Sequence, residues 1–225
     1  RALERLGGVP AVVRVDNTFG DHSALHIPND YYTYGGITRP VELQEVTGLF
    51  LDKLMATPRK GKETWKLEVR LRVRNAGPES AGGRVKLRVA GAEKNVTIPE
   101  VPAGETLEVS AVINKLAVEP WSETSPRLYD LEAVLVRGNA EVDDLIERVG
   151  FREIRVKGKK LLLNGEEVHL RGFNRHEDHP TFGYAVPPAL MAHDLDLFRD
   201  LNCNFLRTCH YPNDARMLDL CDERG

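Results

Sequence analysis

A strict alternation of polar and apolar side chains over residues 65–74 is the feature that most constrains how this chain can fold. Successive side chains of a β-strand point to opposite faces of its sheet, so this alternation predicts a strand with one buried and one solvated face. Residues 75–78 (Asn-Ala-Gly-Pro) then predict a turn. Further alternating runs lie at residues 83–89, 107–113 and 128–136. Short strands separated by turns across residues 47–152 predict a β-sandwich of immunoglobulin type.

Three arginines on the polar face of the first run, Arg70, Arg72 and Arg74, allow a second interpretation as a phosphate-binding stripe. Leu71 and Val73 alternate with them, so the solvated face of a half-buried strand accounts for the pattern without a nucleic acid. The 225-residue chain carries a formal net charge of -3, which gives no general attraction to nucleic acid or to an anionic membrane. No apolar run approaches the roughly 20 residues that span a bilayer. We expect neither nucleic acid nor membrane as a partner.

The first 46 residues carry two strand-like runs, at residues 12–15 and 41–46. The loop between them is longer than an ordinary structureless connection, and its tyrosines favour an ordered segment. Two strands alone are marginally stable, so we expect them to complete a domain that begins upstream. The chain also begins at Arg1 without a charged-then-apolar leader, which predicts that its N-terminus is a cut.

Beyond residue 152 the pattern changes to strands that alternate with helices. Asn164-Gly165 lies between apolar runs and predicts a hairpin. Pro188 suits the first turn of a helix. The apolar stripe of that helix is assigned to Leu190, Leu197, Phe198 and Leu201, and its solvent side to Asp194, Arg199 and Asp200. A strand at residues 204–208 and a second helix from Pro212 follow, and this order predicts a parallel α/β fold.

Titratable side chains gather where the two predicted parallel strands end. Residues 174–185 form a long polar loop after the first strand, and Arg207, His210 and Tyr211 follow or end the second. In a barrel of parallel strands this carboxyl end is the face that binds ligands. His, Asn, Arg and Asp supply directional donors and acceptors, which favours recognition of sugar hydroxyls. The alternative is an ordinary solvated loop.

The three cysteines, Cys203, Cys209 and Cys221, are odd in number and lack the spacing of a disulfide framework. They predict reduced thiols and a cytoplasmic location. A zinc site that combines them with His193 or His210 would be indicated by a Cys-x-x-Cys pair, which is absent. His176 and His179 lack the i, i+4 spacing of a His-Glu-x-x-His motif. We therefore expect no metal and no cofactor, and interpret the cysteines as small packing residues.

Four stretches carry more specific strings of residues, in this order: 29–41, 121–129, 171–178 (Arg-Gly-Phe-Asn-Arg-His-Glu-Asp) and 204–212 (Asn-Phe-Leu-Arg-Thr-Cys-His-Tyr-Pro). Together they resemble the family 2 glycoside hydrolases, which include β-galactosidases, β-glucuronidases and β-mannosidases. The resemblance implies a multidomain β plus α/β fold. Its expected parts are the end of a jelly-roll sugar-binding domain (1–46), an immunoglobulin-like β-sandwich (47–152) and the first two βα units of a (β/α)8 TIM barrel (153–225).

The resemblance also implies residue roles. Asp30 is similar to the acid that reaches from the jelly roll into the barrel pocket to bind sugar hydroxyls, although by itself it would be interpreted as a turn residue. His176 and His210 resemble the histidines that line the glycone site. Arg207 resembles the arginine that supports a catalytic carboxylate, since a guanidinium favours the ionised form that a nucleophile requires. Cys209 stands where the family more usually has serine, a small change of packing.

Residues 31–37 resemble the glucuronidase form of their segment, so the expected substrate is a terminal β-glucuronide first and a β-galactoside next. Retaining glycosidases need two carboxyl groups about 5–5.5 Å apart, and in this family both are glutamates from later barrel strands. Glu177, in the first βα loop, and Glu223, near the end of the second helix, do not fill these roles. We therefore expect a fragment of a retaining β-glycosidase that lacks both catalytic glutamates and is inactive alone.

The competing hypothesis is a non-catalytic carbohydrate-binding or structural β-sandwich protein. The resemblance to an enzyme also allows a homo-oligomer of the longer chain.

Overall fold

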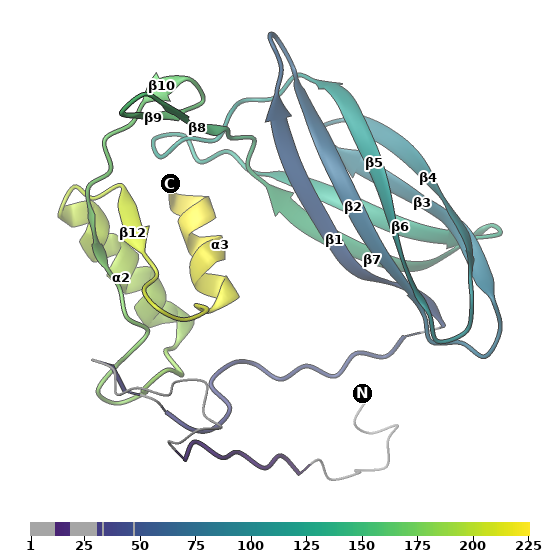
Figure 1. Ribbon diagram of the computed structural model, residues 1–225, viewed down its shortest axis with the longest axis horizontal. Coiled ribbons are helices and arrows are strands. Elements are labelled where there is room, and N and C mark those ends of the chain that lie inside the picture. Colours follow the sequence, from purple (N-terminus) through teal and green to yellow (C-terminus); the bar gives the residue numbers. More distant parts are fainter. Residues whose placement is uncertain (1–11, 19–30, 33, 47) are drawn as a thin grey trace. The chain divides into compact units, whose positions relative to one another are not determined.

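The computed structural model describes residues 12–18, 31–32, 34–46 and 48–225 (Figure 1). The chain divides into two compact units. One consists of Val46–His169 with Asp222–Gly225, and the other of Arg1–Glu45 with Leu170–Cys221. Within the described part of the chain, no helix has the length and apolar character needed to cross a membrane.

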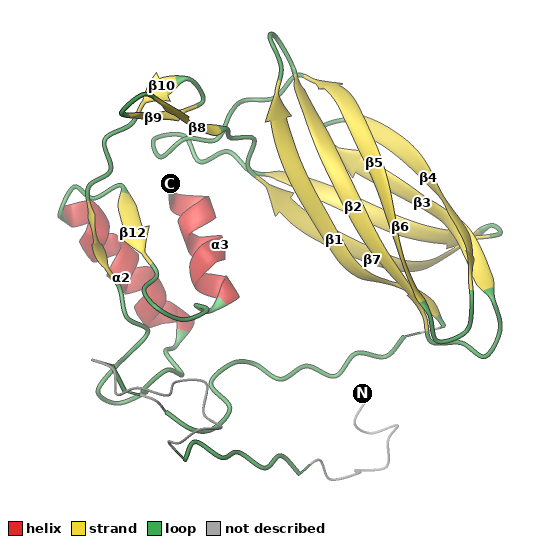
Figure 2. Cartoon of the chain, viewed as in Figure 1, coloured by secondary structure: helices red, strands yellow, loops and turns green. Residues whose placement is uncertain are grey.

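The first unit is built on two antiparallel sheets, drawn as yellow arrows in Figure 2. The order β1-β2-β5 forms one sheet, from β1 (Leu49–Lys60), β2 (Trp65–Asn75) and β5 (Thr106–Leu116). The order β4-β3-β6-β7 forms the other, from β3 (Ala81–Val89), β4 (Ala92–Val101), β6 (Tyr129–Arg137) and β7 (Ala140–Val149). Buried side chains from both sheets make one hydrophobic core, so the predicted β-sandwich is confirmed.

Strand β2 shows the predicted alternation: Leu67, Val69, Leu71 and Val73 are almost completely buried. The intervening arginines lie on the solvated face, as predicted. Arg72 donates to Glu108 Oε1 of β5 at 2.9 Å and lies 3.7 Å from Asp52 Oδ2 of β1. The arginine is therefore paired with acids on both neighbouring strands, which supports the interpretation of this row as a sheet surface.

Aromatic packing adds to the sandwich core. Phe151 is fully buried, and its ring meets the edges of Trp65 and Tyr129 at centroid distances of 5.8 and 5.6 Å. Edge-to-face pairs of this kind stabilise a core beyond the area that they bury. The unit therefore contains an extensive hydrophobic core of its own.

A small three-stranded sheet follows, in the order β10-β9-β8. It consists of β8 (Ile154–Lys157), β9 (Lys160–Leu163) and β10 (Glu166–Glu167). Asn164 and Gly165 both have positive φ, at 54° and 96°, as the predicted two-residue hairpin turn requires. The Asn164 side chain also accepts from the Glu153 amide and donates to the Trp121 carbonyl, both at 2.9 Å.

The second unit contains the expected parallel α/β elements. Strand β11 (Gly172–Asn174) pairs in parallel with β12 (Phe205–Arg207), and α2 (Pro188–Asp200) connects them. Helix α3 (Ala215–Arg224) follows. Gly172 lies opposite Phe205 so closely that a Cβ atom there would be 1.7 Å from the Phe205 carbonyl oxygen. The two strands can approach in this way only because residue 172 has no side chain.

Two details of these helices correct the sequence prediction. In α2 the fully buried residue is Met191, whereas Leu197 and Leu201 are 48% and 65% exposed. The sequence predicts Asp194 on the solvent side, but its carboxylate accepts from Nε of the buried Arg175 at 2.8 Å. Helix α3 begins at Ala215 rather than at Pro212.

The prediction of two strands near the N-terminus is wrong. Residues 12–15 and 41–46 are not in strands, and their apolar side chains are open, with Val12 90% and Val41 78% exposed. Among the described residues no neighbouring strand completes a ladder for them, and without a ladder a strand has little stability. The jelly-roll assignment depends largely on residues 1–11 and 19–30, which lie outside the described residues, so it stays a prediction.

Candidate functional site

The histidine–tyrosine cluster is formed by Tyr31, His176, His210 and Tyr211. Tyr31 stacks on His210 with ring centroids 5.5 Å apart and planes 17° apart, and its ring centroid is 5.8 Å from that of His176. The two histidine rings are 5.5 Å apart. Tyr211 completes the group, with its ring 5.4 Å from Tyr31 and 5.9 Å from His176. The structure therefore brings together both predicted sugar-binding histidines.

Parallel pairing explains why these residues meet. Asn174 lies opposite Arg207, and the Arg175 amide donates to the Arg207 carbonyl at 2.9 Å just beyond the ladder. The carboxyl ends of β11 and β12 thus lie side by side. His176 follows the first strand and His210 the second, so the chain delivers both to the same edge. The sequence-based expectation that this edge carries the site is consistent with their placement.

The Tyr211 hydroxyl ties the cluster to the loop after β11. Its oxygen accepts from the Glu177 amide at 2.9 Å and lies 3.2 Å from His176 Nδ1. Burial raises the pKa of Tyr211. Burial, followed by the nearby Tyr211, raises the pKa of Tyr184 to about 12. Both phenols therefore stay neutral at ordinary pH and act as hydrogen-bonding groups.

The tyrosines of the N-terminal segment lie against the same loop, a contact that the sequence did not predict. The Tyr34 hydroxyl donates to Asp178 Oδ1 at 2.8 Å, and this hydrogen bond raises the pKa of Tyr34. The Tyr184 hydroxyl donates to the Tyr32 carbonyl. Tyr34 also meets the edge of Tyr184 at 4.9 Å. These contacts hold the rings of Tyr34 and Tyr184 together next to the histidine–tyrosine cluster.

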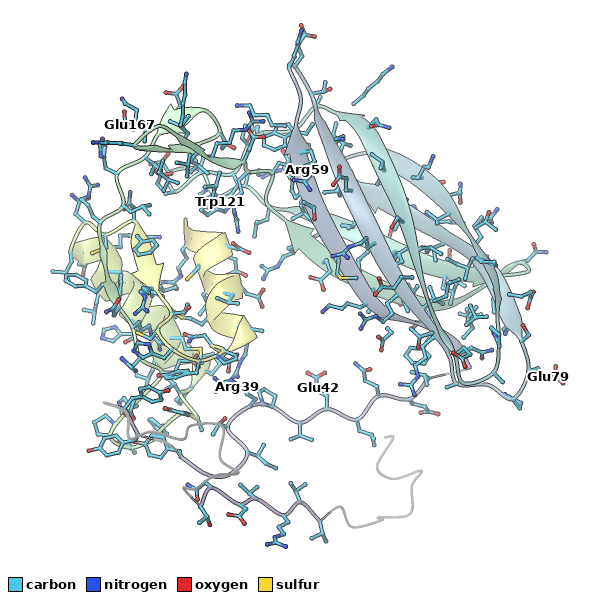
Figure 3. The ribbon with its side chains drawn as sticks, in the orientation of Figure 1. Arg39, Glu42, Arg59, Glu79, Trp121 and Glu167 are labelled. Atoms are coloured by element: carbon cyan, nitrogen blue, oxygen red, sulfur yellow. The ribbon has the colours of Figure 1, made fainter. Side chains whose placement is uncertain are left out.

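Next to the cluster lies a buried ion network that sequence reasoning missed. Glu177 is fully buried and accepts from Arg39 Nη2 and, at 2.9 Å, from the Asp214 amide. Arg39, labelled in Figure 3, also lies 3.7 Å from Asp214 Oδ2. Arg175 Nη1 is 4.0 Å from Glu177, and Arg175 Nη2 is 2.8 Å from Asp194. Buried charges persist only when they are paired in this way.

Asp214 joins this network to helix α3. Its Oδ1 accepts from the Arg216 amide at 2.9 Å, an N-cap arrangement, and its Oδ2 lies 2.6 Å from Arg216 Nη2. The cap explains why the helix begins at Ala215. Hydrogen bonding to the Arg216 side chain lowers the pKa of Asp214 and raises that of Arg216.

The lowered pKa of Asp214 predicts a loss of stability in acid. A carboxyl whose folded pKa lies below its unfolded value contributes stability above the unfolded pKa, and that contribution disappears as the pH falls through the folded pKa. An aspartate carboxyl ordinarily has a pKa of 3.8, so this loss falls below pH 3.8. In Asp214→Asn, the stability of the α/β unit should change less with pH in that range. Amide exchange of residues 215–221, measured at several pH values, tests this. An unchanged pH dependence would contradict it.

The remaining predicted site residues are less fully placed. Arg207 ends β12 with an exposed side chain, and its support of a catalytic carboxylate stays a prediction. Asp30 lies outside the described residues. Glu177 is enclosed in the ion network, and Glu223 pairs with Arg148. Both acids are therefore held in ion pairs, and the expectation that neither is a catalytic group stays a prediction.

Comparison with known proteins gives two matches to one family. Residues 49–152 match the family described as "Glycosyl hydrolases family 2", and residues 154–225 match the TIM barrel domain of the same family. The β-galactosidase of Streptococcus thermophilus is 30% identical over 87% of this chain, and the chain spans 19% of that enzyme's length. This chain is thus similar to a limited part of much longer proteins.

Solved structures give the same result with closer similarity. A β-galacturonidase from Eisenbergiella tayi bound to galacturonate shares 44% identity over 94% of this chain and 38% of its own, with a TM-score of 0.87. A β-glucuronidase from Bacteroides uniformis shares 30% identity over 94% of this chain and 27% of its own, with a TM-score of 0.83. The two domain matches, these likenesses and the two-sheet sandwich followed by parallel βα units agree: this chain belongs to glycosyl hydrolase family 2.

Proposed function

We propose that these residues form part of the glycone site of a retaining β-glycosidase that acts on terminal β-linked hexuronides. The observation that carries the proposal is the convergence of His176, His210 and Tyr31 at the carboxyl edge of β11 and β12. Histidine ring nitrogens and the adjacent phenol can donate to and accept from sugar hydroxyls. Tyr31 supplies an apolar ring face beside them.

Uronides are preferred over neutral sugars because two similar structures carry that activity in their names, one of them bound to galacturonate. This modifies the sequence-based order of β-glucuronide first and β-galactoside next, since the galacturonidase is 44% identical. The two uronic acids differ only in the orientation of one hydroxyl, so both belong to the proposed substrate class.

The chemistry itself is proposed to need residues outside these 225. Glycoside hydrolysis requires two carboxyl groups, one on each side of the scissile bond. Glu177 cannot approach a substrate without leaving its pairing with Arg39 and the Asp214 amide. We expect no hydrolysis of aryl β-hexuronides by this chain alone. Turnover by a purified sample that disappears in His176→Ala would contradict this.

Binding of the free sugar tests the site directly. Calorimetry or NMR titration of the 225-residue chain should show tighter binding of galacturonate or glucuronate than of galactose. His176→Ala and His210→Ala should each weaken binding by roughly tenfold, because one net hydrogen bond contributes about 0.5–1.5 kcal/mol and 1.4 kcal/mol is a factor of ten. His193→Ala changes an exposed histidine on α2 and serves as the matched control.

The outcomes separate the alternatives. Uronate binding that survives both histidine substitutions would contradict the glycone site and favour a carbohydrate-binding sandwich. Galactose that binds as tightly as galacturonate would retain the glycone site and contradict the uronide class.

A further inference from the structure

Three side chains with metal-ligating atoms converge at the histidine–tyrosine cluster, two from the cluster itself and one from the neighbouring Cys209. One ring nitrogen of His176, one ring nitrogen of His210 and Sγ of Cys209 all lie within 4.8 Å of one another. Their spacing in the sequence gave no metal motif, because two of them are adjacent and the third comes from another strand end. The parallel pairing of β11 and β12 brings them together.

We propose that His176, Cys209 and His210 form a site for a zinc ion. Zinc prefers thiolate sulfur and imidazole nitrogen, and three protein ligands with an open fourth position are a recurring arrangement. Bonds of about 2.0–2.3 Å to a tetrahedral zinc place ligand atoms roughly 3.3–3.6 Å apart. Ligand atoms within 4.8 Å need to close by about an ångström, which side-chain rotation of the exposed His210 can supply.

The neighbours of these ligands suit the proposal. Tyr211 Oη is 3.2 Å from His176 Nδ1, so it can accept a hydrogen bond from Nδ1–H in the tautomer that leaves the Nε2 lone pair for the metal. Outer hydrogen bonds of this kind orient most metal-bound histidines. Cys209 Sγ lies 3.7 Å from the Arg207 carbonyl oxygen, a weak thiol hydrogen bond. On zinc binding the thiol proton goes to solvent and the sulfur binds as thiolate.

The position of the site has a functional consequence. Two of its ligands are the histidines proposed to bind the sugar, so bound zinc and bound uronate should exclude each other. This competition rests on the proposed function, whereas metal binding by the three side chains does not. A site of this kind would make sugar binding sensitive to free zinc.

Cobalt(II) replaces zinc as a visible probe of the ligand set. Titration of the 225-residue chain with cobalt chloride should give one equivalent of bound metal and a sulfur-to-cobalt charge-transfer band in the near ultraviolet, and zinc chloride should bleach it. Cys209→Ser should abolish the band. Tyr211→Phe should retain the band but weaken zinc binding by roughly 10–100-fold, as loss of an outer hydrogen bond does elsewhere.

Controls keep this test decisive. Cys203→Ser removes another free thiol and should leave the band unchanged. Circular dichroism will show whether Cys209→Ser is folded. If it is not, His210→Ala provides a second test, because loss of this ligand should weaken cobalt binding. No charge-transfer band in the unaltered chain, or a band that survives in folded Cys209→Ser, would overturn the zinc site. A band without uronate competition would retain the zinc site and contradict the proposed function.

Discussion

Replacing Glu177 by alanine should destabilise the α/β unit by about 3–5 kcal/mol, the usual result of removing one partner from a buried ion pair. Arg39 would lose the nearer of its two carboxylate partners, and Arg175 would lose the negative charge 4.0 Å away. The Asp214 amide would lose its acceptor, and a buried donor left without one carries its own penalty. The loss should be felt in the loop after β11 and at the start of α3 together.

Amide hydrogen exchange is the suitable measurement. Exchange of residues 172–176 and 205–217 should accelerate by roughly 10²–10⁴-fold if these amides open with the whole unit. Both tryptophans, Trp65 and Trp121, belong to the sandwich unit, so tryptophan fluorescence should change little. Glu42→Ala removes an exposed glutamate of the N-terminal segment, labelled in Figure 3, and serves as the control. Equal exchange in the two variants would refute the structural role of Glu177.

Gly172→Ala should separate β11 from β12 and abolish the site. The added Cβ would lie 1.7 Å from the carbonyl oxygen and 2.6 Å from the carbonyl carbon of Phe205. Both atoms are backbone, so no side-chain rotation relieves the clash and the strands must move apart. Overpacking costs about 1–3 kcal/mol where neighbours can yield, and more is expected here.

The readouts are cross-strand contacts and ligand binding. NMR should show loss of the contacts between residues 172–174 and 205–207, and uronate binding should fall by more than tenfold because His176 and His210 no longer share an edge. Asn174→Ala in the same strand adds no atoms and should retain the cross-strand contacts. If Gly172→Ala retains them as well, the close approach of the two strands is wrong.

Elements with a strong local pattern were predictable. Strand β2 was evident from its alternation, and the start of α2 from Pro188. The sequence did not predict strands β1, β4, β7 and β8, and all four lie at sheet edges. Strand β4 carries polar residues and a proline, and β7 is rich in acids with one buried residue, as suits an edge. These strands alternate less regularly than β2, so the sequence pattern identifies them less readily.

The site was predictable only in part. Parallel strand ends must share an edge, so the approach of His176 and His210 followed from the topology. The pairing of Arg39 with Glu177 did not, because no local pattern records a contact between residues 138 positions apart. The same network pairs Asp194 of α2 with the buried Arg175, a contact that the predicted solvent side of the helix did not include.

That long separation has a consequence during synthesis. Ribosomes add roughly 5–20 residues per second, so about 7–28 s pass between the appearance of Arg39 and that of Glu177. The whole sandwich sequence is added within that interval, so every residue of its core is synthesised before Glu177. The segment that carries Tyr31 and Arg39 therefore cannot pair with the loop after β11 until the sandwich has been synthesised. Its capture by the loop after β11 is expected to be a late event in the folding of the nascent chain.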